Sequence, residues 1–340
     1  MQTKSSMKIP SALRLEVARP TERMLVFLVA LLAVVAHSVA AADDGRGKRI
    51  ALTFDDVPRA PGSYYTPEER TGRLIAALEE GRVGQAAFFV TTGNLDDIAG
   101  GEERIERYVA AGHVIANHSH MHTHLSETSA EDYLADIDRA NGWLTGREGL
   151  RPWFRFPYLD EGREHTARRD AVRAGLAERG LVNGYVTIDA SDWFYDEAVN
   201  RAIAEGRAVD MVALGDLFVE SHVGAAEFFD DLARRVFGRS PIHVLLLHEA
   251  DVTAMFLPDL IAALEDSGWT IVPVDDAFAD PIAAISPDVP SAQGTLTELA
   301  AWERGLPAPR WYERNDERVA REFFDTRVLG IARTSVEVTD

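Results

Sequence analysis

Short apolar runs alternate along the chain with segments whose apolar residues recur at helical spacing. The apolar runs indicate strands at 49–54, 86–91, 113–117, 153–156, 181–188, 243–247 and 270–272. A regular alternation of strand and helix is typical of sheets whose neighbouring strands run parallel. The pattern therefore predicts an α/β protein with a mainly parallel sheet, either open or closed into a barrel.

Helices are predicted between these strands. Thr66-Pro67-Glu68-Glu69 combines a capping threonine, a proline in the first turn and a reciprocal glutamate, which together mark a helix start. A second capping box is expected from Thr128 to Glu131, opening a helix that runs to about residue 140. Further helical segments are expected at 105–111, 165–179, 196–237 with a break near Gly224, and 258–267.

The two ends of the chain differ from this repeating region. Basic residues precede an apolar run at 24–36, and small residues follow up to Ala40, which predicts a signal peptide over 1–40. The run is shorter than the ~20 residues that a spanning helix needs, so we expect cleavage and no stable membrane span, with a retained anchor as the alternative. Export without cysteine fits a periplasmic or secreted bacterial protein. The remainder divides into a domain at 43–285 and a C-terminal extension at 286–340 that is rich in proline and charge.

Composition narrows the chemistry further. The chain has 55 acidic and 35 basic residues, for a formal net charge of −20, which disfavours nucleic acid and anionic membranes as partners. It has no cysteine, so disulfides, thiolate nucleophiles and cysteine-based metal sites are excluded. Any bound metal must be held by histidine, aspartate or glutamate.

Candidate metal ligands follow two of the predicted strands. Thr53-Phe54-Asp55-Asp56 ends the first, and Val57-Pro58 after it supplies the break that lets both carboxylates serve one site. The third strand leads into a segment with four histidines within seven residues. His118 and His122 are four apart, so on a helical turn their rings share a face, while His120 and His124 are expected to have supporting roles. With Asp56 they make a His₂Asp set that leaves an open position, as in catalytic metal sites.

Three further polar motifs follow later strands. They are Arg155-Phe156-Pro157-Tyr158, Asp189-Ala190-Ser191-Asp192-Trp193 and Leu247-His248. Taken alone, His248 could equally be a buried, hydrogen-bonded structural histidine. Five polar motifs at the ends of five strands, however, would share the rim at which α/β barrels build their active sites.

In this order the five motifs resemble those of the polysaccharide deacetylases of the NodB-homology type, carbohydrate esterase family 4. The resemblance extends from about residue 49 to residue 274. It implies a distorted (β/α) barrel of about seven parallel strands for the domain at 43–285. It also implies a divalent metal, most likely zinc, with cobalt or nickel as alternatives.

The resemblance also implies a role for each motif. Asp55 would be the general base, with Arg155 orienting it, and His248 would be the general acid, paired with Asp192. A second set would bind the metal and the substrate: Asp56, His118 and His122 as metal ligands, a backbone N–H at Tyr158 toward the oxyanion, and Trp193 lining the acetyl pocket.

Two departures from the family pattern concern the loops that shape the substrate groove. Val57-Pro58-Arg59 stands where many members have Gly-Pro, and Tyr158-Leu159-Asp160 stands where many have Tyr-Gly. The resemblance does not extend to residues 286–340.

The favoured function is removal of N-acetyl groups from a glycan of the bacterial envelope by a metal-activated water. The glycan would be of the chitooligosaccharide, poly-N-acetylglucosamine or peptidoglycan type. One alternative is an O-acetyl esterase or a cyclic-amide hydrolase on the same scaffold, because the metal and the base serve any acyl carbonyl. Another is a non-catalytic protein that binds a glycan or a metal, which predicts the loss of the base or the acid. A two-histidine iron oxygenase is disfavoured by the β/α pattern and by the matched acid and base.

Overall fold

The computed structural model describes residues 47–331. The chain divides into two units, Met1–Ala42 and Asp43–Asp340, and every described residue belongs to the second. The predicted signal peptide at 1–40 lies outside the described residues. Within 47–331 no helix is both long enough and apolar enough to cross a membrane.

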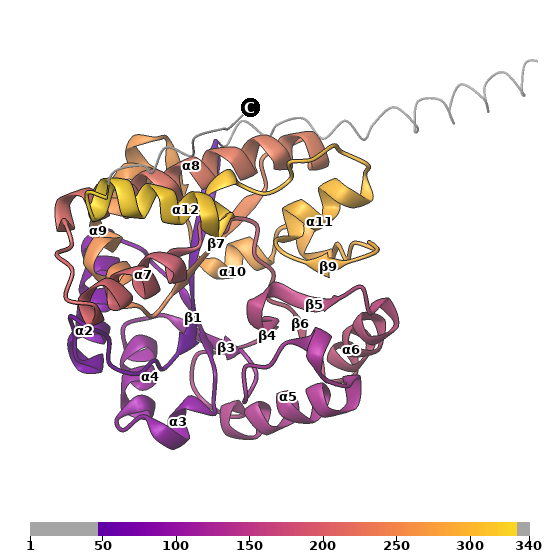
Figure 1. The fold of residues 1–340 in the computed structure, drawn as a ribbon. Helices are drawn as coiled ribbons and strands as arrows, with labels where there is room; N and C mark the ends of the chain where they lie inside the picture. Colours follow the sequence, from indigo (N-terminus) through magenta and orange to yellow (C-terminus); the bar gives the residue numbers. More distant parts are fainter. Residues whose placement is uncertain (1–46, 332–340) are drawn as a thin grey trace, which may run out of the picture. The chain divides into compact units, whose positions relative to one another are not determined.

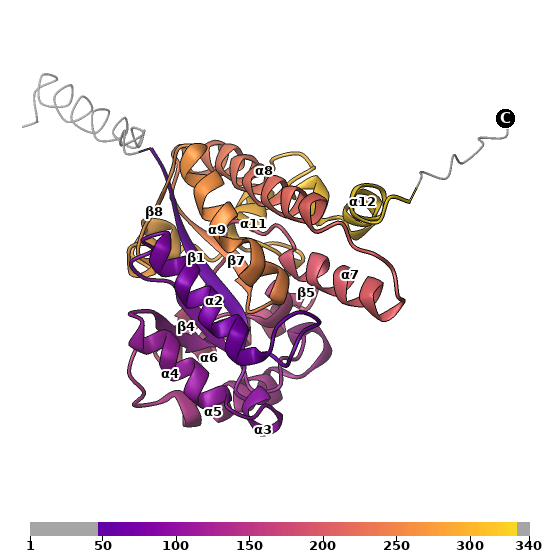
Figure 2. The same cartoon turned by 90° about the vertical axis from the view of Figure 1, so that its left-hand side faces the viewer.

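Seven strands form one sheet in which every neighbouring pair is parallel. Their order is β6-β4-β3-β2-β1-β7, and β8 also pairs with β1. Figure 1 labels β6, β4, β3, β1 and β7, and Figure 2 labels β8. The strands are β1 (Lys48–Val57), β2 (Ala87–Val90), β3 (Val114–Asn117), β4 (Leu150–Phe154), β6 (Val182–Asn183), β7 (Ile242–His248) and β8 (Trp269–Ile271). The parallel α/β sheet predicted from the alternating pattern is confirmed.

The segment from 182 to 188 joins the two edges of this sheet. Its first two residues pair with β4 as β6, and Ile188, five residues after them, makes a parallel bridge to Leu245 of β7. The strand predicted at 181–188 is therefore regular only at its start, because its two ends pair with opposite edges of the sheet. The result is a distorted barrel rather than an open sheet, as the family resemblance implied.

Side chains alternate between the two faces of β1. Ile50, Leu52 and Phe54 pack into the main hydrophobic core with the outer helices, whereas Ala51 belongs to the smaller interior core. The three helices α2 (Pro67–Glu80), α8 (Met211–Phe237) and α9 (Asp251–Asp266) pack beside one another outside β1 and β7 (Figure 2). This alternation places Thr53 and Asp55 on the interior face.

The remaining helices follow the strands in chain order. They are α3 (Asn94–Asp97), α4 (Gly101–Ala110), α5 (Ala130–Leu144), α6 (Thr166–Glu178), α7 (Asp192–Ala204) and α10 (Val274–Phe278), with 3₁₀ turns η1 (Leu125–Glu127), η2 (Pro157–Leu159) and η3 (Pro281–Ala284). The capping box predicted at Thr66 is present, since Thr66 and Glu69 exchange hydrogen bonds with each other's backbone N–H groups.

Three predicted helix boundaries are wrong. The stretch at 196–237 is interrupted between α7 and α8, where Gly206 has φ +71°, and not near Gly224, which lies inside α8. Helix α9 begins at Asp251 and contains Pro258 in its interior, where the sequence suggested a start. The cap of α5 is Ser129, whose hydroxyl accepts the N–H of Asp132, and not the predicted Thr128.

The C-terminal extension forms its own short elements. These are β9 (Ala292–Gln293), α11 (Leu296–Glu303), η4 (Glu313–Asn315), α12 (Glu317–Phe323) and the π-helical turn η5 (Phe324–Val328). Strand β9 pairs antiparallel with β5 (Asp160–Arg163) as a separate two-stranded sheet. Ala320, Phe324 and Val328 are buried in the main hydrophobic core, so the extension is part of the packed domain.

Candidate active site

A bulge at the end of β1 brings two neighbouring carboxylates to one side of the strand. Asp55 is buried on the interior face, and the pairing with β2 shifts register between Phe54 and Val57. Asp56 has φ +64°, in the left-handed region, and this breaks the alternation that would otherwise turn it away from Asp55. The regular alternation of β1 is therefore interrupted at Asp56, inside the strand and one residue before the predicted break at Val57-Pro58.

His118 and His122 converge through a loop after β3. A helical turn would place both rings on one face, but the segment is irregular, with φ +70° at Ser119 and +52° at His122. The Ser119 hydroxyl accepts the backbone N–H of His122 at 2.9 Å, which stabilises the bend. The two ring Nε2 atoms lie 3.2 Å apart. The pairing of the rings thus comes from loop geometry rather than from helical spacing.

The donor set of Asp56, His118 and His122 fits a tetrahedral cation. Asp56 Oδ1 lies 2.9 Å from His122 Nε2 and 3.5 Å from His118 Nε2. Ligand atoms about 2.0–2.1 Å from a zinc ion at tetrahedral angles would be about 3.3 Å apart, which agrees with these separations. Asp56 Oδ1 is buried and has no hydrogen-bond partner of acceptable geometry among residues 47–331. An orphaned carboxylate oxygen facing two imidazole nitrogens is the arrangement that a metal would satisfy.

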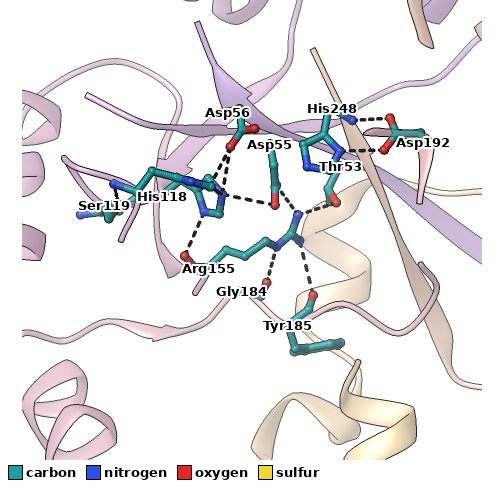
Figure 3. A network of polar contacts seen from close by, with 12 residues as sticks. Thr53, Asp55, Asp56, His118, Ser119, Arg155, Gly184, Tyr185, Asp192 and His248 are labelled. Atoms are coloured by element: carbon teal, nitrogen blue, oxygen red, sulfur yellow. Dashed lines mark hydrogen bonds and ion pairs between the residues drawn. The ribbon is translucent and has the colours of Figure 1, made fainter. Parts of the chain in front are cut away.

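The protonation of these groups suits metal binding. The Nδ1–H of His118 donates to the Arg155 carbonyl at 3.0 Å, so in the neutral ring the lone pair is on Nε2, toward the cluster (Figure 3). Burial raises the pKa of Asp56. The nearby His118 and His122 and the charge of His248 outweigh this and hold that pKa well below its usual range. Asp56 is therefore an anion at neutral pH.

Asp55 is held by a buried arginine. Arg155 Nη1 donates to Asp55 Oδ1 at 2.6 Å and to the Thr53 hydroxyl at 2.8 Å, and its Nε donates to the Gly184 carbonyl at 2.7 Å (Figure 3). The guanidinium also lies 3.8 Å from the centre of the Phe89 ring. The second oxygen of Asp55 lies 3.6 Å from His118 Nε2, next to the metal-ligand set. One carboxylate oxygen is thus tied to Arg155, while the other faces the cluster.

His248 and Asp192 form a second anchored pair beside Asp55. His248 is the direct register partner of Asp55 on the adjacent strand β7. Its Nδ1–H donates to Asp192 Oδ1 at 2.7 Å, and its backbone N–H donates to Asp192 Oδ2, also at 2.7 Å (Figure 3). The Thr253 hydroxyl and the N–H of Trp193 complete the four donors around Asp192.

The charges of this pair follow from these contacts. Burial lowers the pKa of His248, but the carboxylates of Asp192, Asp56 and Asp55 outweigh it and raise that pKa to about 9. Burial raises the pKa of Asp192, while the charge and hydrogen bond of His248 lower it to about 2. His248 therefore carries a proton at neutral pH in the metal-free protein, as a general acid must.

The structure brings Tyr158 to the edge of the metal-ligand set. Its ring is half exposed, stacks on His124 at 3.6 Å between ring centres, and meets the His122 ring edge-on at 4.6 Å. Trp193 lies in the first turn of α7, half buried, in edge-on contact with Phe194. The backbone N–H of Trp193 donates to Asp192 Oδ1 at 2.9 Å.

Sequence reasoning left several supporting residues without a role. Thr53 and Ser119 lie inside the matched motifs, so their positions in the sequence could have indicated a supporting role. Thr253 lies outside the last motif, and nothing in the sequence indicates its contact with Asp192. His120 and His124, expected to be supporting, bond to Thr92 at 2.9 Å and to Asp160 at 3.1 Å.

The chain is similar to known polysaccharide deacetylases. The family model described as polysaccharide deacetylase matches residues 42–178. A chitin deacetylase of Colletotrichum lindemuthianum is 30% identical over 236 residues, which cover 68% of this chain and 79% of that protein. A chitooligosaccharide deacetylase of Rhizobium leguminosarum bv. trifolii is 28% identical over 194 residues, covering 55% and 79%. The solved structure of a family 4 carbohydrate esterase from Streptomyces lividans covers 72% of this chain and 99% of that one, with 22% identity and a TM-score of 0.46.

The chitin deacetylase is 30% identical to this chain over 68% of the chain's length. The resemblance stated from the five motifs is therefore confirmed. The chain belongs to the polysaccharide deacetylase family.

Proposed function

We propose that this protein is a metal-dependent hydrolase that removes N-acetyl groups from an N-acetylated glycan. The observation that carries the proposal is the arrangement of three groups at one rim. A buried carboxylate, Asp55, lies next to the convergent ligands Asp56, His118 and His122, and a protonated imidazole, His248, is its direct neighbour across the strand ladder.

Asp56, His118 and His122 would hold the metal. A divalent cation bound there, zinc in our proposal with cobalt or nickel as alternatives, acidifies water and polarises an acyl carbonyl. The fit rests on the orphaned Asp56 oxygen, on the fixed tautomer of His118 and on donor atoms that lie within 4.8 Å of one another.

Asp55 would act as the general base. Arg155 holds one of its oxygens at 2.6 Å, so the other is aimed at the site to accept a proton from the attacking water. Arg155 also donates to the Thr53 hydroxyl and to the Gly184 carbonyl, and these contacts fix the orientation of the Arg155–Asp55 pair. This orientation matters because a general base must lie within hydrogen-bond reach of the proton that it removes.

His248 would act as the general acid. An amine departs only after it has been protonated, because an amide anion is a very poor leaving group. Asp192 binds Nδ1 of His248, so the ring keeps Nε2–H as the proton that it can donate. Tyr158 and Trp193, at the two sides of this rim, are the residues that we assign to substrate contact.

The presence of both base and acid supports catalysis over a non-catalytic binding protein. The acid supports an amide over an ester, since an alkoxide needs less help to leave. The relatives named above act on chitin and chitooligosaccharides, and the predicted signal peptide would deliver this chain to the bacterial envelope. These observations support an envelope glycan as the substrate.

Acetate release is the test. The full chain is assayed on chitooligosaccharides, poly-N-acetylglucosamine, peptidoglycan fragments and acetylated xylan, with Asp55→Asn as the matched control. We expect acetate from at least one of the three N-acetylated substrates, loss of activity on chelation, and recovery with zinc or cobalt. Acetate from xylan alone would establish an O-acetyl esterase. Glycan binding without any acetate would establish a non-catalytic protein.

A further inference from the structure

The segment that closes the barrel has one side bonded to β7 and the other side facing the C-terminal extension. The N–H groups of Thr187 and Ile188 both donate to the Val244 carbonyl, at 3.0 and 3.1 Å. The Ile188 carbonyl accepts the N–H of Leu246 at 3.0 Å. The carbonyls of the neighbouring residues 186, 187 and 189 are not used by β7, and they need other donors when buried.

The C-terminal extension supplies a donor to each of these carbonyls. The Leu296 N–H donates to Val186 at 2.8 Å, and the Thr297 hydroxyl donates to Thr187 at 3.2 Å. The third donor is Asn315, whose Nδ2 lies 2.9 Å from the Asp189 carbonyl. The closing segment is therefore held on one side by the barrel and on the other by residues far along the chain.

The Asn315 contact lies three residues from the carboxylate that anchors His248. Asp189 Oδ1 accepts the N–H of Ser191 at 2.8 Å, and Ser191, with φ +53°, turns the chain directly into Asp192. Asp192 then accepts the backbone N–H and the Nδ1–H of His248, at 2.7 Å each. A short rigid path thus joins Asn315 to the imidazole of His248.

The same extension also contacts the loop that carries Tyr158. The Gly294 N–H donates to the Leu159 carbonyl at 3.1 Å, and β9 pairs with β5 at Gln293 and Asp160. Gly294 has φ +111°, and a Cβ there would lie 2.7 Å from Glu298 Oε2, so glycine is needed for this contact.

The extension is itself firmly attached to the barrel helices. Arg314 binds Glu220 and donates to the Ser221 hydroxyl at 3.1 Å, and that hydroxyl contacts Tyr195 of α7 at 2.8 Å. Tyr312 packs against α8 at Gly224, where a Cβ would lie 2.4 Å from its hydroxyl oxygen. This close approach explains why a glycine stands within α8 without interrupting it.

We propose that residues 292–315 act as a clamp on the turn that carries Tyr158 and on the loop that leads into Asp192 at the start of α7, and that Asn315 is a positioning residue for the general acid His248. The inference rests on the proposed function in so far as His248 is the acid. The clamp itself rests only on the contacts above. The extension therefore adds contacts to both segments beyond those made by the rim motifs themselves.

The test compares Asn315→Asp and Asn315→Ala with the wild type. Asn315→Asp keeps the shape but sets an acceptor oxygen against the Asp189 carbonyl, and Asn315→Ala removes the contact without repulsion. We expect hydrolysis of an N-acetylated oligosaccharide to fall by ~10–100-fold, the scale on which small displacements of a catalytic group act. Cleavage of an aryl acetate should stay near the wild-type rate, because a phenolate leaves without an acid. Amide exchange at 186–193 should become faster.

Thr326→Ala is the matched control. Its hydroxyl donates to Glu322 and Phe323 carbonyls within the same extension, so its loss leaves the clamp contacts in place. Equal loss of amide and ester cleavage in both Asn315 variants, or no loss at all, would overturn the positioning role. If the wild type releases no acetate from any glycan, the proposed function fails, and exchange at 186–193 alone decides the clamp: unchanged exchange in both variants would refute it.

Discussion

Replacing Asp192 by asparagine tests whether this carboxylate keeps His248 protonated. Asp192 accepts four hydrogen bonds, from the His248 ring and backbone, from Thr253 and from Trp193. Asparagine has the same shape but carries no charge and turns an NH₂ toward two of these donors. The variant therefore removes the largest attraction that favours the imidazolium and leaves the burial that opposes it.

The size of the effect follows from the shift itself. In the metal-free protein the pKa of His248 is raised from 6.5 to about 9, and each pKa unit corresponds to ~1.4 kcal/mol. The raised pKa, to which Asp192 makes the largest favourable contribution, thus adds up to about 3 kcal/mol to the free energy of unfolding. Because the folded-state pKa is the higher one, this stability is fully present below pH 6.5 and is lost as the pH rises through 9. In Asp192→Asn the pKa of His248 should fall toward its usual range, since only Asp56 and Asp55 still favour the charged ring, and the loss of stability should become smaller and shift to lower pH.

Two measurements check the prediction. Urea unfolding of both chelator-treated proteins at several pH values from 6 to 10 gives the pH dependence of the free energy of unfolding. NMR titration of the imidazole gives the pKa of His248 directly, with His248→Gln identifying its signal. A wild-type imidazole that titrates at or below pH 6.5, or an equal loss of stability above that pH in both proteins, would refute the electrostatic reasoning.

The remaining predictions concern catalysis and the metal. Asp55→Asn should retain zinc and lose turnover by a factor of ~10²–10⁴, whereas Asp56→Asn should also lose metal affinity. Metal analysis beside acetate-release kinetics distinguishes the two variants, and loss of metal from Asp55→Asn would reverse the roles. His248→Ala should abolish most amide hydrolysis and spare much aryl acetate cleavage, and an equal fall in both rates would return His248 to a structural role. Arg155→Met should leave Asp55 buried without its partner and lower the free energy of unfolding by about 3–5 kcal/mol in urea titration; a change under about 1 kcal/mol would contradict this.

Much of the fold could be predicted from local patterns. The apolar runs predicted the parallel strands, and the Thr66 capping box predicted the start of α2, because such signals depend on neighbouring residues alone. The two-residue period of β1 similarly directs Asp55 inward, beside Thr53. The five strand-end motifs identified the residues that meet at the rim, since strand ends in a parallel barrel share one edge.

Other features depend on contacts between residues far apart in the chain. His118 and His122 meet through a loop with two left-handed residues, and no helical spacing describes that bend. The predicted helix break at Gly224 is wrong. A glycine is present there because Tyr312, 88 residues later in the chain, packs against the helix at this position. Local pattern cannot report which distant side chain will fill the space beside a residue.

The sequence by itself therefore determined which polar residues lie at the strand ends, because side-chain type and strand position are local properties. The tertiary structure decided how these residues face one another. Only the folded chain shows that 182–188 joins both edges of the sheet, and that Asn315 bonds the loop before Asp192. Closure and clamping arise from hydrogen bonds between distant segments, whose backbone groups must find partners once they are buried.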